Sequence, residues 1–390
     1  MSNVKPAERV LNVQEYYFSR KQKEVAKLNE DGNDIISLAI GSPDMPPSKQ
    51  TIDKLCEVAN DPNAHGYQPT VGTPELREAM ANFYKKWYGV DLDPKTDIQP
   101  LIGSKEGILH VTLAFVNPGD EVLVPDPGYP TYTSLSKILG AKIVNYNLCE
   151  DNGWQPDFEE LEAKDLSHVK LMWTNYPNMP TGGNAHMETY QRLVEFARKH
   201  DIVVVNDNPY SFILNDHPIS LLQVPGAKDC CIEFNSMSKS FNMPGWRVGM
   251  CASNPTFISW ILKIKSNIDS GTFRGIQLAA AEAYNTNTPE WHHEYNVETY
   301  QRRRNVAEKI MNTLGCSFDQ KQVGMFLWGK IPEKYADVEE LTERVLHEAR
   351  VFITPGFIFG NNGKRYIRIS LCAKNAKIEE ALCRIEALKW

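Results

Sequence analysis

The chain has 390 residues, a formal net charge of −7 at pH 7 and a hydrophobic fraction of 42%. This length gives room for about two or three domains with a buried core, and the acidic balance argues against binding to nucleic acid or to a membrane surface. The chain shows no apolar secretory signal and no run of about 20 apolar residues, so we expect a soluble, cytoplasmic protein.

The eight cysteines are scattered along the chain. They form no C-x-x-C pair and no Cys/His group with the spacing of metal ligands. Four of them lie in apolar, strand-like segments, where buried reduced thiols are the ordinary interpretation: Cys230, Cys231, Cys251 and Cys372. We therefore expect neither disulfides nor a metal site.

Strand-like apolar runs alternate with helix-like stretches along most of the chain. The runs cover residues 121–124, 169–173, 202–205, 231–234 and 248–251. This alternation predicts an α/β fold with a mostly parallel sheet flanked by helices.

A second, smaller α+β domain is predicted after residues 286–289. A charged helical stretch follows there, and strand-like runs cover 324–329 and 366–371. We place the large domain at 49–286 and the small one at 287–390. Prolines 43, 46 and 47 indicate a connector, so residues 1–48 are expected to pack with the small domain.

Gly103 and Ser104 precede a helix-like stretch that reaches Phe115. The backbone N–H groups of Ser104 and Lys105 would then lie at a helix N-terminus, where the helix dipole favours an anion such as phosphate. The Walker A spacing is absent. Taken alone, the pattern also fits an ordinary capped helix.

Asp207 follows the apolar run 202–205, and Asn206 lies between them. A carboxylate at the mouth of a buried strand is costly unless a cation accompanies it, and the protonated ring nitrogen of a cofactor would be such a cation. The alternative is an Asp-Asn-Pro turn that caps a core strand.

Lys239 follows the run 231–234 in the sequence Ser236-Met237-Ser238-Lys239, with Arg247 eight residues further on. A desolvated lysine amine attacks carbonyls, and hydroxyls with a guanidinium suit an anionic aldehyde, for which pyridoxal phosphate is the obvious candidate. In an extended segment Ser236 and Ser238 would share one face and reach one phosphate. A lysine among serines, considered alone, is more often a solvated loop residue.

Further segments combine glycine, proline or aromatic residues with polar side chains: 66–77, 126–130, 175–182 and 366–370. With the motifs above, they resemble those of the class I aminotransferases, the fold-type I family of pyridoxal phosphate enzymes. The matching motifs follow the family's order from about Tyr16 to Arg368. The form Gly-Ser-Lys-Glu-Gly at 103–107 is similar to that of the subgroup acting on aspartate, diaminopimelate and related acids.

The resemblance implies ping-pong transamination, with Lys239 as the catalytic residue that forms a Schiff base with pyridoxal 5'-phosphate and serves as general base. The implied cofactor-binding residues are Ser104, Lys105, Tyr129, Asn178, Asp207, Tyr210, Ser236, Ser238, Arg247 and Tyr67. The implied substrate-binding residues are Arg368, Gly41, Tyr16 and Arg274. No metal is implied.

Individual roles follow from the same resemblance. The Tyr129 ring would stack on the cofactor ring, and Arg368 would bind the substrate α-carboxylate. Tyr67 would reach the phosphate of a neighbouring subunit, which implies a homodimer. Arg274 would bind phosphate, a substrate carboxylate, or neither.

Met179 departs from the family pattern, which has an asparagine that donates to the cofactor's phenolate oxygen at this place. A thioether cannot donate a hydrogen bond. Either Asn178 or Asn175 substitutes through a local shift, or Tyr210 makes the contact alone, which would raise the Schiff-base pKa.

The function expected from the sequence is transfer of an amino group between an acidic amino acid such as aspartate and 2-oxoglutarate. Lys105 and Arg274 are the candidate partners of a distal carboxylate. The alternatives are a C–S β-lyase of the same fold, an aminotransferase for alanine or LL-diaminopimelate, and a pseudoenzyme that binds the cofactor without turnover. A DNA-binding regulator is disfavoured, because the residues before Gly41 are few and not strongly basic.

Overall fold

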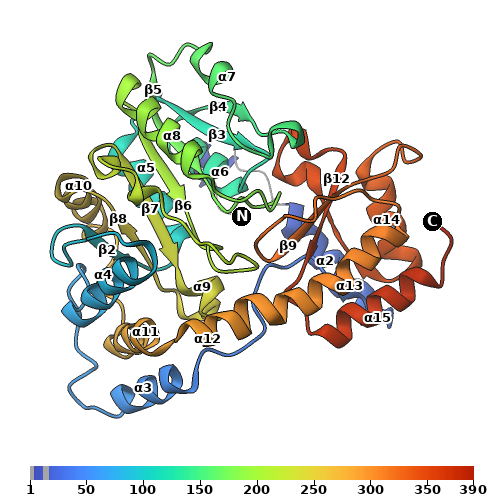
Figure 1. Cartoon of the computed structure of the whole chain (residues 1–390), viewed down its shortest axis with the longest axis horizontal. Coiled ribbons are helices and arrows are strands. Elements are labelled where there is room, and N and C mark those ends of the chain that lie inside the picture. The colour runs from blue at the N-terminus through green and yellow to red at the C-terminus, as the bar shows by residue number, and fades with distance from the viewer. Residues whose placement is uncertain (1–3, 12–16) are drawn as a thin grey trace.

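A seven-stranded sheet forms the centre of the protein, whose computed structural model describes residues 4–11 and 17–390 (Figure 1). Its strands, in spatial order, are β2 (Ile98–Leu101), β8 (Gly249–Ala252), β7 (Cys231–Ser236), β6 (Val203–Asp207), β5 (Val169–Thr174), β3 (Glu121–Asp126) and β4 (Lys142–Asn147). All neighbours are parallel except where β8 pairs with β7 and β2. The predicted α/β class with a mostly parallel sheet is therefore confirmed.

Helices cover both faces of this sheet (Figure 1). On one face lie α5 (Ser104–Phe115), α6 (Pro130–Ile138) and α10 (Pro255–Lys265), which contribute to one apolar cluster. The other face packs against a second cluster with α4 (Pro74–Tyr88), α8 (Met187–His200) and α11 (Arg274–Thr286). Along β5 the side chains alternate between the clusters, because successive strand residues point to opposite faces: Leu171 belongs to one and Met172 to the other. Burial on both faces explains why these strands appear as continuous apolar runs.

A smaller antiparallel sheet has the order β11 (Thr354–Pro355), β12 (Tyr366–Ser370), β9 (Phe326–Lys330). The helices around it are α13 (Thr299–Thr313), α14 (Val338–Glu348) and α15 (Asn375–Glu386). A continuous helical run made of α12 (Pro289–His292), a π-helical segment (His293–Glu298) and α13 extends between the two sheets in Figure 1. It begins at Thr288, whose hydroxyl accepts a hydrogen bond from Trp291 N, and Pro289 occupies the first turn, where its missing N–H costs nothing.

The N-terminal residues pack against this smaller unit. Strand β1 (Ile36–Ser37) pairs in parallel with β10 (Val351–Phe352), and Phe18 of α2 (Tyr17–Glu30) packs near Phe352. The expected association of the N-terminal segment with the C-terminal part agrees with these contacts, and the exact domain boundaries stay a prediction. The remaining helices are α1 (Glu8–Leu11), α3 (Lys49–Ala59), α7 (Phe158–Glu162) and α9 (Met237–Ser240). Within the described ranges, no helix is long and apolar enough to cross a bilayer.

The sequence analysis missed β2, β4 and the two-residue strands. β4 lies at the sheet edge and is largely exposed or half-buried, so it lacks a clear apolar run. The extended conformation considered for Ser236 and Ser238 applies only to Ser236, which ends β7. Ser236 also caps the short helix α9, which contains Ser238, because its hydroxyl accepts a hydrogen bond from Ser238 N.

Candidate active site

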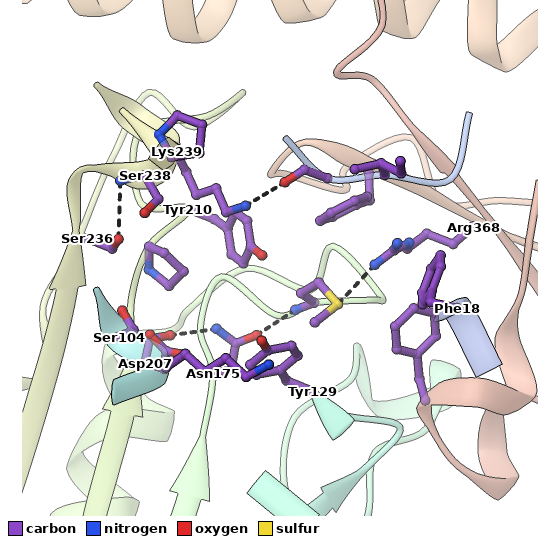
Figure 2. Close-up of a pocket in the computed structure, with 18 of the residues that line it drawn as sticks. Phe18, Ser104, Tyr129, Asn175, Asp207, Tyr210, Ser236, Ser238, Lys239 and Arg368 are labelled. Carbon is purple, nitrogen blue, oxygen red and sulfur yellow. Dashed lines mark hydrogen bonds between the residues drawn. The ribbon is translucent and has the colours of Figure 1, made fainter. Parts of the chain in front are cut away.

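A pocket of about 610 Å³ opens where the carboxyl ends of the parallel strands meet the smaller sheet (Figure 2). Strands β6 and β7 end there, α5 begins there, and β9, β12 and α2 contribute side chains from the other side. Carboxyl ends of parallel strands are the usual place for ligand sites in open α/β sheets. The site residues predicted from the sequence that line this pocket are Gly41, Ser104, Lys105, Tyr129, Asp207, Tyr210, Ser236, Ser238, Lys239, Arg247 and Arg368.

Lys239 lies on α9, directly after β7, and its side chain extends toward Gly41 (Figure 2). Its Nζ donates a hydrogen bond to the Gly41 carbonyl oxygen at 2.5 Å. Burial lowers the pKa of this amine, and the charges of Arg368 and Arg247 act in the same direction. A lowered pKa increases the fraction of neutral amine, which is the form that attacks a carbonyl.

Asp207 is buried at the end of β6, with an exposed fraction of 5%. The Tyr132 hydroxyl donates to its Oδ2 at 2.9 Å, whereas Oδ1 has no hydrogen-bond partner within the described chain. Burial raises the pKa of this carboxyl to about 6, although the Tyr132 hydroxyl and, more weakly, the nearby Ser104 hydroxyl act in the opposite direction. A buried carboxylate oxygen without a partner fits a cationic ring N–H.

Groups that are suited to an anion lie together where α5 begins. Gly103 has a φ of 76° and caps the helix without a side chain, so the first N–H groups of α5 stay available. A Cβ on Gly103 would overlap the Arg247 guanidinium, which explains the glycine. Arg247 donates to the Pro244 carbonyl at 2.9 Å and contacts Ser238 Oγ at 3.5 Å, and Ser104 Oγ has no hydrogen-bond partner among the described residues.

Arg368 lies buried in β12, with an exposed fraction of 4%. Its Nη2 donates to the Ala39 carbonyl at 2.8 Å, and Nη1 lies 3.2 Å from the sulfur of Met179. The guanidinium also lies 3.9 Å from the ring centre of Phe326, 4.6 Å from that of Phe359 and 5.7 Å from that of Phe18. The alternative of a solvated strand residue is therefore excluded. The planar fork remains suited to a carboxylate in the pocket.

Asn178 does not line the pocket. Its Oδ1 accepts from Thr181 Oγ at 2.7 Å and its Nδ2 donates to the Asn175 carbonyl at 3.2 Å, so the amide is used inside its own loop. Asn175 and Met179 line the pocket instead, and Asn175 Nδ2 donates to the Asp207 carbonyl at 2.5 Å. Asn175 Oδ1 also accepts a hydrogen bond from Met179 N at 2.9 Å, so the amides of both asparagines are engaged within the chain. A contact of either asparagine with the cofactor stays a prediction, and Asn175 is the one that lines the pocket.

Two more predicted residues lie away from the pocket of this chain. Arg274 begins α11 and pairs with Glu75 at 3.3 Å, so it does not reach the substrate side of its own site. Tyr67 is 95% exposed. Tyr16 lies outside the described residues.

The sequence analysis missed several residues of the pocket. Tyr132 stacks on Trp173 with ring centres 4.9 Å apart and donates to Asp207, which only the fold brings near it. The apolar side chains around Arg368 come from α2, β9 and the turn before β12. Ser19 and Gln22 also line the pocket from α2.

The donor set fits pyridoxal phosphate. Asp207 Oδ1 offers an acceptor for the ring nitrogen, Lys239 an amine for the aldehyde, and the N-terminus of α5 with Arg247 a site for the phosphate. The pocket is also within the usual size range of small-molecule sites.

Comparison with known proteins agrees with this geometry. The family model for aminotransferase class I and II matches residues 33–385, and the chain belongs to this family. It is a pyridoxal-phosphate-dependent aminotransferase with the fold-type I architecture, and its substrates are small molecules.

Relatives of known sequence extend over the whole chain. The LL-diaminopimelate aminotransferase of Dehalococcoides mccartyi (strain CBDB1) is 40% identical over 388 residues, covering 99% of both chains. That of Moorella thermoacetica is 42% identical over 381 residues, covering 97% of both. Among solved structures, apo-BacF from Bacillus subtilis is 34% identical with a TM-score of 0.94, covering 100% of this chain and 99% of the other. A probable N-succinyldiaminopimelate aminotransferase from Thermus thermophilus is 32% identical with a TM-score of 0.88, covering 95% of this chain and 99% of the other.

Proposed function

We propose that the protein transfers an amino group between an L-amino acid with a second carboxylate, with LL-diaminopimelate as the preferred donor, and 2-oxoglutarate. Of the described residues that line the pocket, four are cationic: Lys105, Lys239, Arg247 and Arg368. If Lys239 binds the cofactor, Arg247 its phosphate and Arg368 the α-carboxylate, Lys105 is left for a distal carboxylate. This surplus cation is the observation that carries the proposal.

Two further considerations support diaminopimelate over the aspartate expected from the sequence. The relatives named for LL-diaminopimelate are about 40% identical over nearly the whole chain. Diaminopimelate also carries a distal ammonium, and the polar residues Ser19 and Gln22 of α2 line the same pocket. Aspartate shares the second carboxylate and stays the alternative. Arg274 is dropped as a distal partner in this proposal, because it pairs with Glu75 outside the pocket.

The residues of the site have separate tasks in this proposal. Bound pyridoxal phosphate supplies an electron-accepting ring for the charge that develops at the substrate α-carbon. Asp207 Oδ1 keeps a proton on the ring nitrogen, and Arg368 holds the α-carboxylate with its fork. The Lys239 amine, once released, moves the proton at the α-carbon, and burial, which lowers its pKa, increases the fraction of neutral amine that can accept that proton.

The proposal is tested by comparing amino acid donors with and without a second carboxylate. The holoenzyme is mixed with LL-diaminopimelate, L-aspartate or L-alanine in the absence of a keto acid, and the visible absorbance of the cofactor is followed. We expect rapid loss of the visible band with diaminopimelate, a slower loss with aspartate and little change with alanine. A preference for alanine would contradict the proposal, and release of ammonia and pyruvate from cystathionine would indicate the β-lyase alternative.

Lys105→Met tests the residue that carries the argument. We expect kcat/KM for diaminopimelate and aspartate to fall about 10- to 100-fold relative to that for alanine, because a charge-assisted hydrogen bond contributes about 1.5–3 kcal/mol. Lys170→Met, on the exposed side of β5, is the matched control. An equal loss for alanine would mean that Lys105 serves the cofactor and not the distal carboxylate.

We also propose that the protein is a homodimer in which Tyr67 enters the partner's site. The side chain is 95% exposed in the single chain, so its ring is accessible to a second subunit.

A further inference from the structure

Four titratable side chains form a cluster beside the N-terminus of α5, outside the pocket. They are Glu106 and His110 of α5, Lys265 at the end of α10, and Asp269 just after it. Lys265 Nζ lies 2.6 Å from Glu106 Oε1 and 2.8 Å from Asp269 Oδ2, and His110 Nε2 also contacts Glu106 Oε1. Lys265 is 3% exposed and His110 is fully buried, so the cluster has little access to water.

This cluster is bonded directly to the turn that forms the anion site. The second oxygen of Glu106 accepts the backbone N–H of Ile102 at 3.0 Å. Glu106 thereby fixes the backbone just before Gly103, while Gly103 contributes no capping side chain. The N–H groups at the start of α5 are left for an external anion.

The negative charge of Glu106 is unfavourable for an anion at the start of α5. Burial would raise the pKa of Glu106, but the hydrogen bonds from His110 and Lys265 outweigh it and lower the pKa to about 2, so the group is ionised. An ionised carboxylate in the first turn of α5 repels a phosphate bound at that helix end. The Lys265 ammonium lies 2.6 Å from Glu106 and 2.8 Å from Asp269, and it offsets one of these two negative charges.

Two more features concern the surroundings of Lys265. It lines, with Arg247 and Gly271, a cavity of about 20 Å³ that is separate from the main pocket. The backbone that follows Asp269 is also anchored, because Gly271 N donates to the Gln68 carbonyl at 3.2 Å. Lys265 is therefore a buried residue on a segment whose backbone is held in place by a hydrogen bond.

We propose that Glu106, His110, Lys265 and Asp269 form a positioning network that holds the turn at 102–105 in its anion-binding shape and compensates the Glu106 charge, so that the dianionic phosphate of the cofactor binds there. None of the four residues touches the substrate pocket. The proposal rests on the phosphate's placement at the start of α5, and it is independent of which amino acid reacts.

Lys265→Met tests charge compensation with two ligands that differ in the phosphate alone. Full-length protein is loaded with pyridoxal phosphate or with pyridoxal, and the affinity of each is measured from the visible absorbance during dialysis. We expect the affinity for pyridoxal phosphate to fall at least about tenfold and that for pyridoxal to change much less, because the variant leaves two carboxylates near the phosphate without their ammonium.

A double variant separates charge from general damage. Glu106→Gln combined with Lys265→Met restores the net charge of the cluster and keeps a carbonyl oxygen for Ile102 N–H, so we expect it to recover most of the lost affinity. Lys228→Met is the matched control, since it breaks another partly buried pair, with Asp97 at 2.7 Å, away from the pocket. We expect the control to leave the ratio of the two affinities unchanged.

The proposal is overturned if Lys265→Met weakens both ligands by the same factor, or if the double variant binds pyridoxal phosphate no better than the single one. If Lys265→Met does not fold, Glu106→Gln alone decides the question through the ratio of the affinity for pyridoxal phosphate to that for pyridoxal. This variant removes the carboxylate charge that repels the phosphate and keeps an acceptor for Ile102 N–H, so the ratio must rise for the proposal to stand. Because no amino acid is present, failure of the diaminopimelate assignment would leave these results unchanged.

Discussion

At the scale of single residues, the pocket contains buried charged side chains. Their burial lowers the stability of the folded protein unless a ligand binds beside them. Asp207 has one oxygen bonded to Tyr132 and the other without a partner among the residues described. Arg368 is enclosed by phenylalanine rings, and its guanidinium contacts the Ala39 carbonyl and the Met179 sulfur at the wall of the pocket. These groups lower the stability of the protein without its ligand, and they interact strongly with a ligand once it is bound.

Asp207→Asn is expected to stabilise the cofactor-free protein at neutral pH. The pKa of Asp207 is raised from 3.8 to about 6 by burial, so its ionisation costs nothing below pH 3.8 and destabilises the folded state increasingly up to about pH 6. The full cost, about 3 kcal/mol, applies above that pH. The variant's gain in unfolding free energy should therefore grow by about 2 kcal/mol between about pH 4.5 and about pH 7.5 in urea titrations.

The same variant should bind pyridoxal phosphate more weakly, because an amide cannot hold a proton on the ring nitrogen as a carboxylate does. A gain that does not change with pH, or an unchanged cofactor affinity, would contradict the assignment of Asp207.

Arg368→Lys is expected to raise KM for both the amino acid and the keto acid about 10- to 100-fold, because an ammonium cannot form the paired hydrogen bonds of a guanidinium. Affinity for pyridoxal phosphate should not change, since the side chain lies across the pocket from α5. Arg302→Lys on the exposed face of α13 is the control. Equal losses in cofactor and substrate binding would mean that the guanidinium serves the packing of β12 instead.

At the scale of elements, the helix N-terminus at α5 could be predicted from the sequence, whereas α9 and the loop at 175–182 could not. Gly-Ser before a periodic stretch is a local signal, and the helix begins at Ser104 as expected. The alternating serines at 236–240 resemble an extended segment, yet tertiary context makes them a capped turn of helix. Whether Asn175 or Asn178 faces the pocket depends on bonds between Asn178 and the backbone of 182–183, which no local pattern reveals.

Gly103→Ala tests the geometry of the α5 N-terminus. Its φ of 76° strains any side chain, and the new Cβ would also overlap Arg247. Gly89→Ala is a matched control, since Gly89 has a φ of 66° but no atom within 4 Å of an added Cβ. Both variants should lose about 1–2 kcal/mol of stability. Only Gly103→Ala should also bind pyridoxal phosphate at least about tenfold more weakly in absorbance titrations, because it displaces Arg247. Similar cofactor affinities in the two variants would show that the turn is not the phosphate site.

At the scale of the whole molecule, the fold brings together segments that are distant in the sequence. The Phe18, Phe326 and Phe359 rings reach Arg368 from three separate elements, so no reading of local motifs could have assembled them. The fold class was predictable because strands buried on both faces leave continuous apolar runs between amphipathic helices. The role proposed for Tyr67 involves a second subunit, so it has to be tested on an assembly of two chains.

Complementation between two inactive variants tests whether Tyr67 serves the partner's site. In a heterodimer of Tyr67→Ala and Lys239→Ala, one site combines an intact Lys239 with an intact Tyr67 from the other subunit, and the second site carries both defects. If Tyr67 crosses the interface, co-expressed subunits with different affinity tags should therefore regain one wild-type-like site per heterodimer, measured as transamination by the doubly purified protein. If Tyr67 serves its own subunit, each site keeps one defect and the heterodimer stays as inactive as the better homodimer. The exposure of Tyr67 in the single chain favours the first outcome, because the ring does not line the active-site pocket that the described residues of its own subunit form.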